Sequence, residues 1–357
     1  NGGSLYLGTS VIGYWQTYSS GLTLDADSTT IIQSSYLGNG YAYYDVIYGT
    51  SYFNASNCSF HNVNFTSDGQ IYGGNNIFNK VTFQANAGIL GDNSFDTLFF
   101  NAGWTVTLDA GSTQTINNAL IADGTCSGLI AIHSSTVGTQ AIIGKASGAI
   151  TVNYILLQDI QATGGATFTA DNSVNGGNVT GWAINAPSAQ NLYWVGGTGN
   201  WSDVNHWATG SGGAGGSCVP TPFDNVFFDA NSFATGDDTL YMDAQTAYCN
   251  DMDWSGVTTT PTFSISSSAN STLKIYGSLI LSPNMTWDLI DWNWGVAASV
   301  SFESTTPGKT ITTANLPLND NGWSFNGMGG EWTLTDSLKK YVYFNNGTLY
   351  SGNQYIG

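Results

Sequence analysis

The chain has 357 residues with 24 Asp or Glu against 6 Lys or Arg, so its net charge is -18 and only 8% of it is charged. All the basic residues are Lys, and without a guanidinium group to neutralise phosphates we exclude a nucleic-acid partner. The charge also disfavours anionic membranes, no apolar run approaches the ~18 residues of a spanning helix, and 41% hydrophobic residues suffice for a core.

The residue types predict an all-β fold. Glu and Lys, the usual residues of helix surfaces, are scarce, whereas Thr, Ser, Asn, Gly, Val, Ile and aromatic residues are abundant. These suit strands and tight turns. Asp and Asn suit turn corners because they tolerate left-handed backbone and hydrogen-bond to it.

A short repeat in the first half predicts a β-solenoid. An aromatic, an aliphatic and a second aromatic residue recur at fixed positions in segments 43–48, 60–65, 78–83 and 95–100, which start 17, 18 and 17 residues apart. Between them, segment 71–76 corresponds to 89–94.

A single coil cannot fold alone, because each large side chain that it buries is worth ~2 kcal/mol while ordering its backbone costs ~1 kcal/mol per residue. We therefore expect stacked coils of a right-handed parallel β-helix, with Phe60, Phe78 and Phe95 on successive rungs.

The second half repeats more loosely. Segments 279–281, 300–302, 323–325 and 341–343 are similar and are spaced by 21, 23 and 18 residues. We interpret them as wider coils of the same kind.

The two ends of the chain resemble each other. Residues 3–8 match residues 347–352, and residues 12–13 match 356–357, all at an offset of 344. We interpret the chain, which begins at Asn1 without a signal-like segment, as an excised slice a little over one period long, with neighbouring repeat units as partners. Segment 1–187 would be the C-terminal part of one β-solenoid repeat unit, 188–222 a junction or cap, and 223–357 the N-terminal part of the next.

The junction carries a resemblance to a known family. The Tyr-Trp-Val-Gly-Gly-Thr-Gly-Asn-Trp run at 193–201, its continuation to 207 and the segment 220–233 resemble the repeat opening of giant adhesin-type surface proteins of gliding bacteria. Segments 325–334 and 172–182 are similar to the middle and closing motifs of such repeats.

These proteins are exported by the type 9 secretion system. The resemblance implies a non-catalytic segment of an extracellular cell-surface stalk for attachment and gliding motility, with the secretion and gliding machinery and surface polysaccharides as partners. The alternatives are a carbohydrate-active β-helix enzyme and a carbohydrate-binding module.

One cluster is a candidate glycan-binding site. It contains five aromatic or acidic residues within eight positions: Trp287, Asp288, Asp291, Trp292 and Trp294. Their spacing does not fit the alternation of a core strand, and aromatic faces suit pyranose rings. A structural role is the alternative.

Three Trp residues open the junction: Trp194, Trp201 and Trp207. They suit either a sugar-stacking platform or a plug over the open end of a solenoid. We favour the plug, because an uncovered end is an exposed strand edge.

The acidic residues and histidines predict no catalytic or metal site. Some Asp residues occur in close pairs, such as Asp25/Asp27, Asp237/Asp238 and Asp251/Asp253. Such pairs are compatible with the two carboxylates of a glycosidase or with calcium ligands, but turn formation explains most of them. The three histidines, His61, His133 and His206, have no ligand partners at metal spacing. We expect no enzyme activity and no cofactor, with structural calcium as an alternative that no specific motif supports.

The cysteines divide unevenly. Cys218 and Cys249 lie in one later stretch and predict a disulfide suited to an exported protein. Cys58 and Cys126 are 68 residues apart. That separation is close to four coils, or ~19 Å along the axis against a disulfide reach of ~7 Å, so we expect separate buried thiols.

Four positions resemble the Asp-Ser/Thr-apolar acceptor for O-glycosylation in bacteria with this export system. They are Ser28, Thr97, Thr239 and Ser337.

Overall fold

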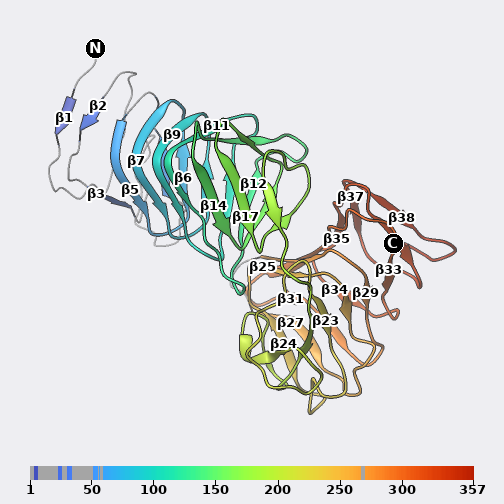
Figure 1. Cartoon of the computed structure of the whole chain (residues 1–357). Helices are drawn as coiled ribbons and strands as arrows, with labels where there is room; N and C mark the ends of the chain where they lie inside the picture. The colour runs from blue at the N-terminus through green and yellow to red at the C-terminus, as the bar shows by residue number, and fades with distance from the viewer. Residues whose placement is uncertain are drawn as a thin grey trace. The chain divides into compact units, whose positions relative to one another are not determined.

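The computed structural model describes residues 4–6, 23–25, 30–33, 51–54, 56, 59–266 and 270–357. Its contacts divide the chain into unit 1 (Asn1–Pro187) and unit 2 (Ser188–Gly357). In the described residues the regular structure is β-strand apart from a short 3-10 helix, η1 (Val204–His206), in unit 2 (Figure 1). The prediction of an all-β fold is confirmed.

Unit 1 contains two long parallel sheets and a shorter one. Sheet I consists, in order across the sheet, of β18 (Val174–Asn175), β15 (Ile155–Gln158), β12 (Ile130–Ser134), β10 (Thr105–Leu108), β8 (Ala87–Ile89), β6 (Gly69–Tyr72) and β4 (Ser51–Asn54). Sheet II consists of β16 (Ile160–Thr163), β13 (Ala141–Gly144), β11 (Thr113–Ile121), β9 (Asn93–Phe100), β7 (Asn76–Phe83), β5 (Ser59–Phe65) and β3 (Thr30–Gln33). Sheet III consists of β14 (Ala149–Asn153), β17 (Thr167–Asp171) and β19 (Ala183–Asn185), and β1 (Ser4–Tyr6) pairs with β2 (Thr23–Asp25). The chain alternates between sheets, so strands adjacent in one sheet are separated in sequence by a passage through another.

The aromatic repeat forms an inward ladder on sheet II. Phe60 pairs with Phe78 and Phe78 with Phe95, and the ring centroids of each pair are 5.2 Å apart. All three side chains are buried. A second ladder, with centroids 4.6 and 5.7 Å apart, contains Phe65, Phe83 and Phe100. The expectation that these residues occupy successive rungs is confirmed, and Figure 1 shows β5, β7 and β9 side by side.

Two details of the predicted repeat in unit 1 are wrong. The strand beside β5 is β3, and segment 43–48, which the spacing placed there, lies outside the described residues. Ile71 pairs with Ile89 at an offset of 18, but Asn76 pairs with Asn93 at an offset of 17. The chain from Ile89 to Asn93 is therefore one residue shorter than the chain from Ile71 to Asn76. As a result, Asn76 lies beside Asn93 and not beside Ser94, which the similarity of the two segments predicted.

Unit 2 contains three sheets. Sheet IV consists of β22 (Trp207–Ala208), β20 (Asn191–Trp194), β23 (Asn225–Phe227), β26 (Met252–Asp253), β29 (Leu279–Ile280), β33 (Lys309–Thr312), β36 (Glu331–Leu334) and β38 (Thr348–Tyr350). Sheet V consists of β21 (Gly199–Asn200), β24 (Thr239–Met242), β27 (Thr262–Ile265), β30 (Thr286–Asp288) and β34 (Leu318–Asn319). Sheet VI consists of β25 (Thr246–Cys249), β28 (Ser271–Ile275), β32 (Val296–Phe302), β35 (Trp323–Phe325) and β37 (Val342–Phe344), and β31 (Ile290–Asp291) pairs with β32.

The strands of unit 2 are parallel except for the pairs β20–β22 and β31–β32. From β23 to β36 the chain visits sheets IV, V and VI in this fixed order. Inward side chains again stack, since Phe302 pairs with Phe325 and Phe325 with Phe344.

The predicted repeat of the second half is confirmed in part. Segments 300–302 and 323–325 lie on successive rungs of sheet VI. Segment 279–281 belongs to sheet IV, and the last rung of sheet VI is 342–344, one residue later than predicted. The sequence Tyr-Val-Tyr-Phe from 341 is apolar on both faces of a strand, so its pattern does not show which face is inward.

Replacing Phe78 by Ala tests the ladder. We expect the free energy of unfolding to fall by about 3–5 kcal/mol, because the ring is buried and stacks on both neighbouring rungs. Ile77→Ala, at the adjacent exposed position of β7, is the control and should change it by less than about 1 kcal/mol. Denaturant titration of both variants measures the difference, and equal values would show that stacking does not stabilise unit 1.

Candidate functional site

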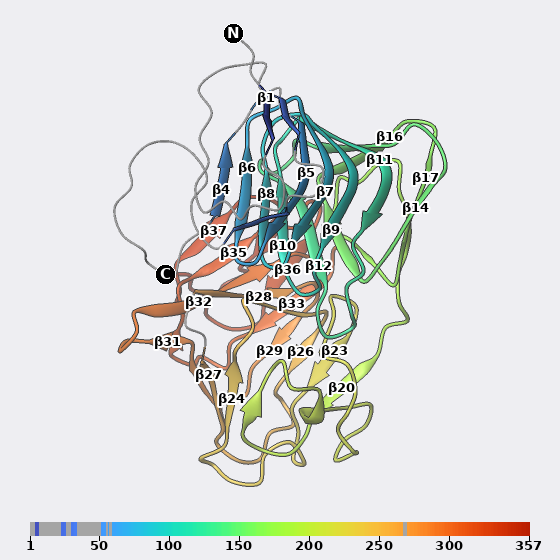
Figure 2. The ribbon, with the colours of Figure 1, turned by 90° about the vertical axis from the view of Figure 1, so that its left-hand side faces the viewer.

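The exposed residues of the predicted glycan site lie on an antiparallel hairpin of unit 2. In the β31–β32 pair, Ile290 is opposite Ala297 and Asp291 is opposite Val296. Gly295 closes the connecting loop with a φ of +64°, a conformation that Gly adopts without strain. In Figure 2 this hairpin stands out from the neighbouring strands of the unit.

Asp291 fixes the loop of the hairpin. Its Oδ1 accepts hydrogen bonds from the backbone N–H groups of Asn293, at 2.9 Å, and Trp294, at 3.4 Å. The Oδ1 of Asn270 accepts from the N–H of Ala297 at 3.0 Å. These contacts hold a loop on which Trp292 and Trp294 are 81% and 79% exposed. We call the β31–β32 hairpin with these two exposed tryptophans the Trp hairpin.

The structure does not bring the whole predicted cluster together. Trp287 is buried in the core of unit 2, whereas Asp288 is half-buried in β30. Trp292 and Trp294 are at the surface, and Asp291 acts through the loop backbone. The predicted site therefore separates into a core tryptophan and an exposed aromatic tip.

A buried carboxylate that the sequence did not single out anchors Trp287. Oδ2 of Asp320 accepts hydrogen bonds from the indole N–H groups of Trp287 and Trp323, each at 2.9 Å. Its Oδ1 accepts from the Gly322 N–H at 2.8 Å and lies 2.9 Å from the Lys340 Nζ. A buried charge is tolerated when a cation and hydrogen-bond donors compensate it. No short-range sequence pattern identifies such a set, because the two tryptophans and the lysine come from different rungs.

Trp194, Trp201 and Trp207 are core residues of unit 2. Trp207 packs edge-on against Trp194 and Trp201, with ring centroids 5.1 and 5.0 Å apart, and all three are buried. The indole N–H groups of Trp194 and Trp207 each donate to a backbone carbonyl at 2.8 Å, that of Gly197 and that of Trp201. Because their faces are covered, they do not form a sugar-stacking platform.

The histidines whose side chains are described serve the fold. His206 stacks on Trp194 at 4.6 Å, and its Nδ1 lies 2.7 Å from the Val195 carbonyl oxygen. His133 contacts the Ser134 carbonyl oxygen at 2.8 Å and the Thr107 hydroxyl at 3.3 Å. The His61 side chain lies outside the described part of the structure. Among the described residues, no group of three or more His, Cys, Asp or Glu side chains is placed to hold a metal ion.

The acid pairs that the sequence singled out cap turns and link rungs. Asp251 accepts from the Ser278 N–H at 2.7 Å, and Asp253 from the Ser255 N–H at 2.8 Å. Asp238 accepts from the Thr235 N–H at 2.8 Å, and this bond is the main reason why the pKa of Asp238 is lowered. The Asp25 side chain and Asp27 are not among the described parts.

The predicted disulfide between Cys218 and Cys249 is wrong. Cys218 is disulfide-bonded, whereas Cys249 is a free thiol that points into the core from β25, beside Ile275 on the next rung. Burial, with smaller contributions from Asp251 and Asp224, raises its pKa and keeps the thiol protonated. Cys126 is also disulfide-bonded and not the separate thiol that we expected, and Cys58 lies outside the described residues. The prediction relied on closeness in sequence. However, side chains alternate between the two faces of β25, and Cys249 is on the face that packs into the core.

The predicted O-glycosylation positions differ in their surroundings. The Thr97 hydroxyl is half-buried and donates to Asp96 at 3.3 Å. The Ser337 hydroxyl accepts from the Tyr355 N–H at 3.3 Å, and Thr239 is half-buried at the start of β24. Ser28 is outside the described residues, and modification of all four positions remains a prediction.

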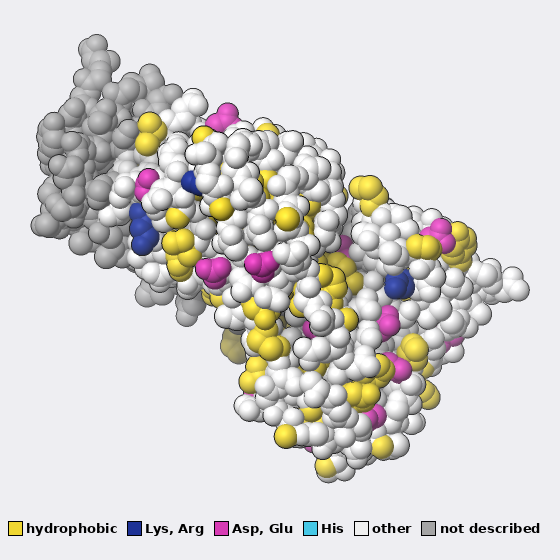
Figure 3. All heavy atoms as spheres, in the orientation of Figure 1, with side chains coloured by type: hydrophobic (Ala, Val, Ile, Leu, Met, Phe, Trp, Pro, Cys, Tyr) yellow, Lys and Arg dark blue, Asp and Glu magenta, His cyan; other side chains and the backbone are white. Residues whose placement is uncertain are grey.

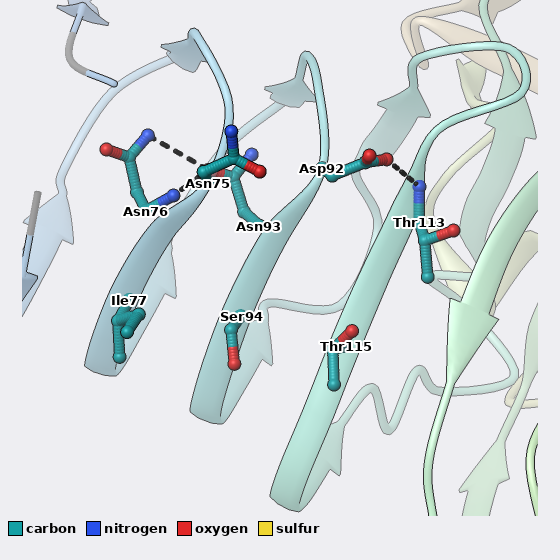
Figure 4. Close-up of a pocket in the computed structure, with 8 residues that line it drawn as sticks. All are labelled: Asn75, Asn76, Ile77, Asp92, Asn93, Ser94, Thr113 and Thr115. Atoms are coloured by element: carbon teal, nitrogen blue, oxygen red, sulfur yellow. Dashed lines mark hydrogen bonds between the residues drawn. The ribbon is translucent and has the colours of Figure 1, made fainter. Parts of the chain in front are cut away.

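A groove of about 300 Å³ crosses a corner of unit 1 (Figure 4). The buried Asn76 side-chain amide donates to Asn93 Oδ1 at 2.9 Å, and the exposed Asp92 accepts from the Thr113 N–H at 2.7 Å. Its remaining lining residues are Asn75, Ile77, Ser94 and Thr115. These hydrogen bonds join neighbouring strands, so the polar residues that make them have a structural role in the groove.

Comparison with known proteins adds no assignment, since no family model, no curated protein and no solved structure matches the chain. Among the described residues, no helix has the length and hydropathy that crossing a bilayer requires. The resemblance to gliding adhesins therefore rests on the sequence motifs alone.

Replacing Asp320 by Ala tests the buried network. The change leaves the Lys340 ammonium and two indole N–H groups without their shared acceptor, and we expect a loss of about 3–5 kcal/mol in the free energy of unfolding. Asp237→Ala, at an exposed position of unit 2, is the control. Equal stability of the two variants in denaturant titrations would contradict the network's role.

Proposed function

We propose that the chain is a non-catalytic structural segment of a long, repetitive bacterial cell-surface adhesin, in which it forms part of a stiff extracellular stalk for attachment and gliding. In this proposal both units are right-handed β-solenoids, residues 188–222 form the junction, and neighbouring repeat units extend the stack. The observation that carries the proposal is the ladder of parallel strands, each of which stacks its inward side chains on those of the next.

The side chains between rungs favour a load-bearing role. Asn62 and Asn79 are joined by a 3.1 Å hydrogen bond on the surface of unit 1, and Asn326 and Asn345 by a 2.7 Å bond in unit 2. Together with the backbone ladder, such bonds oppose separation of neighbouring rungs. In repeat proteins of this kind stability is a sum of contacts between neighbours, so length can increase without loss of stability.

The surface composition agrees with exposure to water rather than to a charged partner. Figure 3 shows few charged side chains on the face that it displays, where backbone atoms and side chains that are neither charged nor hydrophobic predominate. Export by the type 9 system and contact with the gliding machinery are proposed from the resemblance of segments 193–207, 220–233 and 325–334.

Labelling of intact cells tests this function. In the bacterium that makes the protein, antibodies raised against the chain should label unpermeabilised cells, and disabling type 9 secretion should abolish the label. Deleting one 344-residue period, which preserves the repeat register, should keep the label but weaken attachment under flow. Label only on permeabilised cells would contradict an extracellular stalk, and release of reducing ends from polysaccharides by the purified chain would favour the enzyme alternative.

The Trp hairpin favours glycan binding as a second function. The other tryptophans of unit 2 are fully buried: Trp194, Trp201, Trp207, Trp254, Trp287, Trp323 and Trp332. Large aromatic faces gathered at a surface mark interaction sites. Two indole faces on a loop with a fixed backbone suit stacking against sugar rings with little further ordering.

Replacing Trp292 and Trp294 by Ala should reduce binding to any glycan found on an array by about tenfold or more, the effect of truncating an aromatic hot spot. Tyr341→Ala, which removes another exposed aromatic side chain of unit 2, should leave binding unchanged. An array without hits would contradict glycan binding and leave the structural proposal intact.

A further inference from the structure

The base of the Trp hairpin lies against the corner between β34 and β35. The Leu289 N–H, directly before β31, donates to the Asn319 carbonyl oxygen at 2.6 Å. The Ala298 N–H, in β32, donates to the Leu289 carbonyl oxygen at 2.9 Å, and the Asn321 N–H donates to the Ala298 carbonyl oxygen at 2.8 Å. Leu289 and Ala298 are both fully buried. Both strands of the hairpin therefore depend on this corner for their position at the base.

The ammonium group of Lys340 binds three oxygen atoms of the corner. Its Nζ donates hydrogen bonds to the Leu318 carbonyl oxygen at 2.9 Å and to the Asp320 carbonyl oxygen at 2.6 Å. It also lies 2.9 Å from Oδ1 of the Asp320 carboxylate, and the Lys340 and Asp320 side chains are 12% and 0% exposed. An ammonium group has three donors, so these contacts account for all of them. We call Lys340 and these three oxygen atoms the lysine clamp.

The carboxylate of the lysine clamp also contacts the strand that leads into the hairpin. Oδ2 of Asp320 accepts from the indole N–H of Trp287, which lies in β30 two residues before Leu289. Without the Lys340 ammonium group, a buried carboxylate and two carbonyl oxygens would lack their donor. Because such groups are costly to bury unpaired, the corner would open to bring them into contact with water.

Beyond its base, the hairpin is held mostly by its own contacts. Among the described residues, β31 pairs with β32 and with no other strand. Asp291 bonds to the N–H groups of the loop itself, and the Asn270 side chain bonds to the Ala297 N–H. The tip thus keeps its internal shape, while the base sets the direction in which the hairpin points.

We propose that Lys340 is a positioning residue of the Trp hairpin. It holds the corner, and the corner holds the base of the hairpin on which Trp292 and Trp294 are exposed. The inference deepens the proposed glycan site and rests on that proposal for its purpose, whereas the geometry of the lysine clamp is independent of any ligand.

Hydrogen exchange of the full-length chain, measured by mass spectrometry, tests the lysine clamp. Lys340→Met removes the ammonium group and keeps a long side chain. Lys339→Met, at the adjacent exposed position, is the matched control because it removes the same charge. Lys340→Gln is an intermediate variant, since its side-chain amide can still donate a hydrogen bond.

In Lys340→Met we expect the amide groups of segment 289–298 to exchange about tenfold or more faster than in the unsubstituted chain, because hydrogen bonds to a charged group are lost at the base of the hairpin. Segments 239–242 and 246–249, in β24 and β25, should stay within about twofold, since each lies two strands away in its sheet. Lys340→Gln should lie between the two, and Lys339→Met should match the unsubstituted chain.

Faster exchange spread evenly over unit 2 would show a merely structural role and would overturn the positioning role of Lys340. Equal exchange of segment 289–298 in the two Met variants would overturn it as well. If circular dichroism shows that Lys340→Met does not fold, Lys340→Gln and Lys339→Gln provide the same comparison.

The exchange measurement uses no glycan, so its failure differs from failure of the glycan site. An array without hits, together with faster exchange confined to segment 289–298, would contradict glycan binding and leave the lysine clamp standing. Array hits that depend on Trp292 and Trp294, together with unchanged exchange in Lys340→Met, would contradict the lysine clamp alone.

Discussion

The fold depends on stacking between like side chains on successive parallel strands. Phe78 is enclosed by Phe60 and Phe95, and Phe325 lies between Phe302 and Phe344. One rung alone cannot offset the entropy of ordering its backbone, because its apolar side chains have no neighbours above or below. Each added rung supplies that neighbour together with a row of backbone hydrogen bonds, so the stability of every rung depends on the next.

Short polar side chains at the corners set the second constraint. Asp92 accepts from the Thr113 N–H and Asp336 from the Thr313 N–H, each at 2.7 Å, across neighbouring rungs. A carboxylate on a single methylene reaches such N–H groups from a corner, which explains why the acids are almost all Asp. Among the described residues the buried carboxylates are Asp159, Asp224, Glu303 and Asp320. Of these, Asp320 pairs with Lys340 and Glu303 lies 3.8 Å from Lys274.

The exposed tryptophans of unit 2 lie on a feature that differs in kind from the ladder around it. The Trp hairpin interrupts the parallel stack with an antiparallel turn and offers two indole faces on a loop whose backbone Asp291 fixes. Exposed aromatic faces on a loop with a fixed backbone suit a flat ligand such as a sugar ring.

The sequence by itself determined the all-β fold and the inward ladder of Phe60, Phe78 and Phe95 on β5, β7 and β9, because these follow from local periodicity. Only the tertiary structure decided the lengths of the corners, the separation of buried Trp287 from exposed Trp292 and Trp294, and the inward position of the free Cys249. A corner one residue shorter changes the register of every strand after it while leaving the local pattern similar. Contacts such as those of Asp320 join different rungs, so their spacing in sequence follows no fixed period.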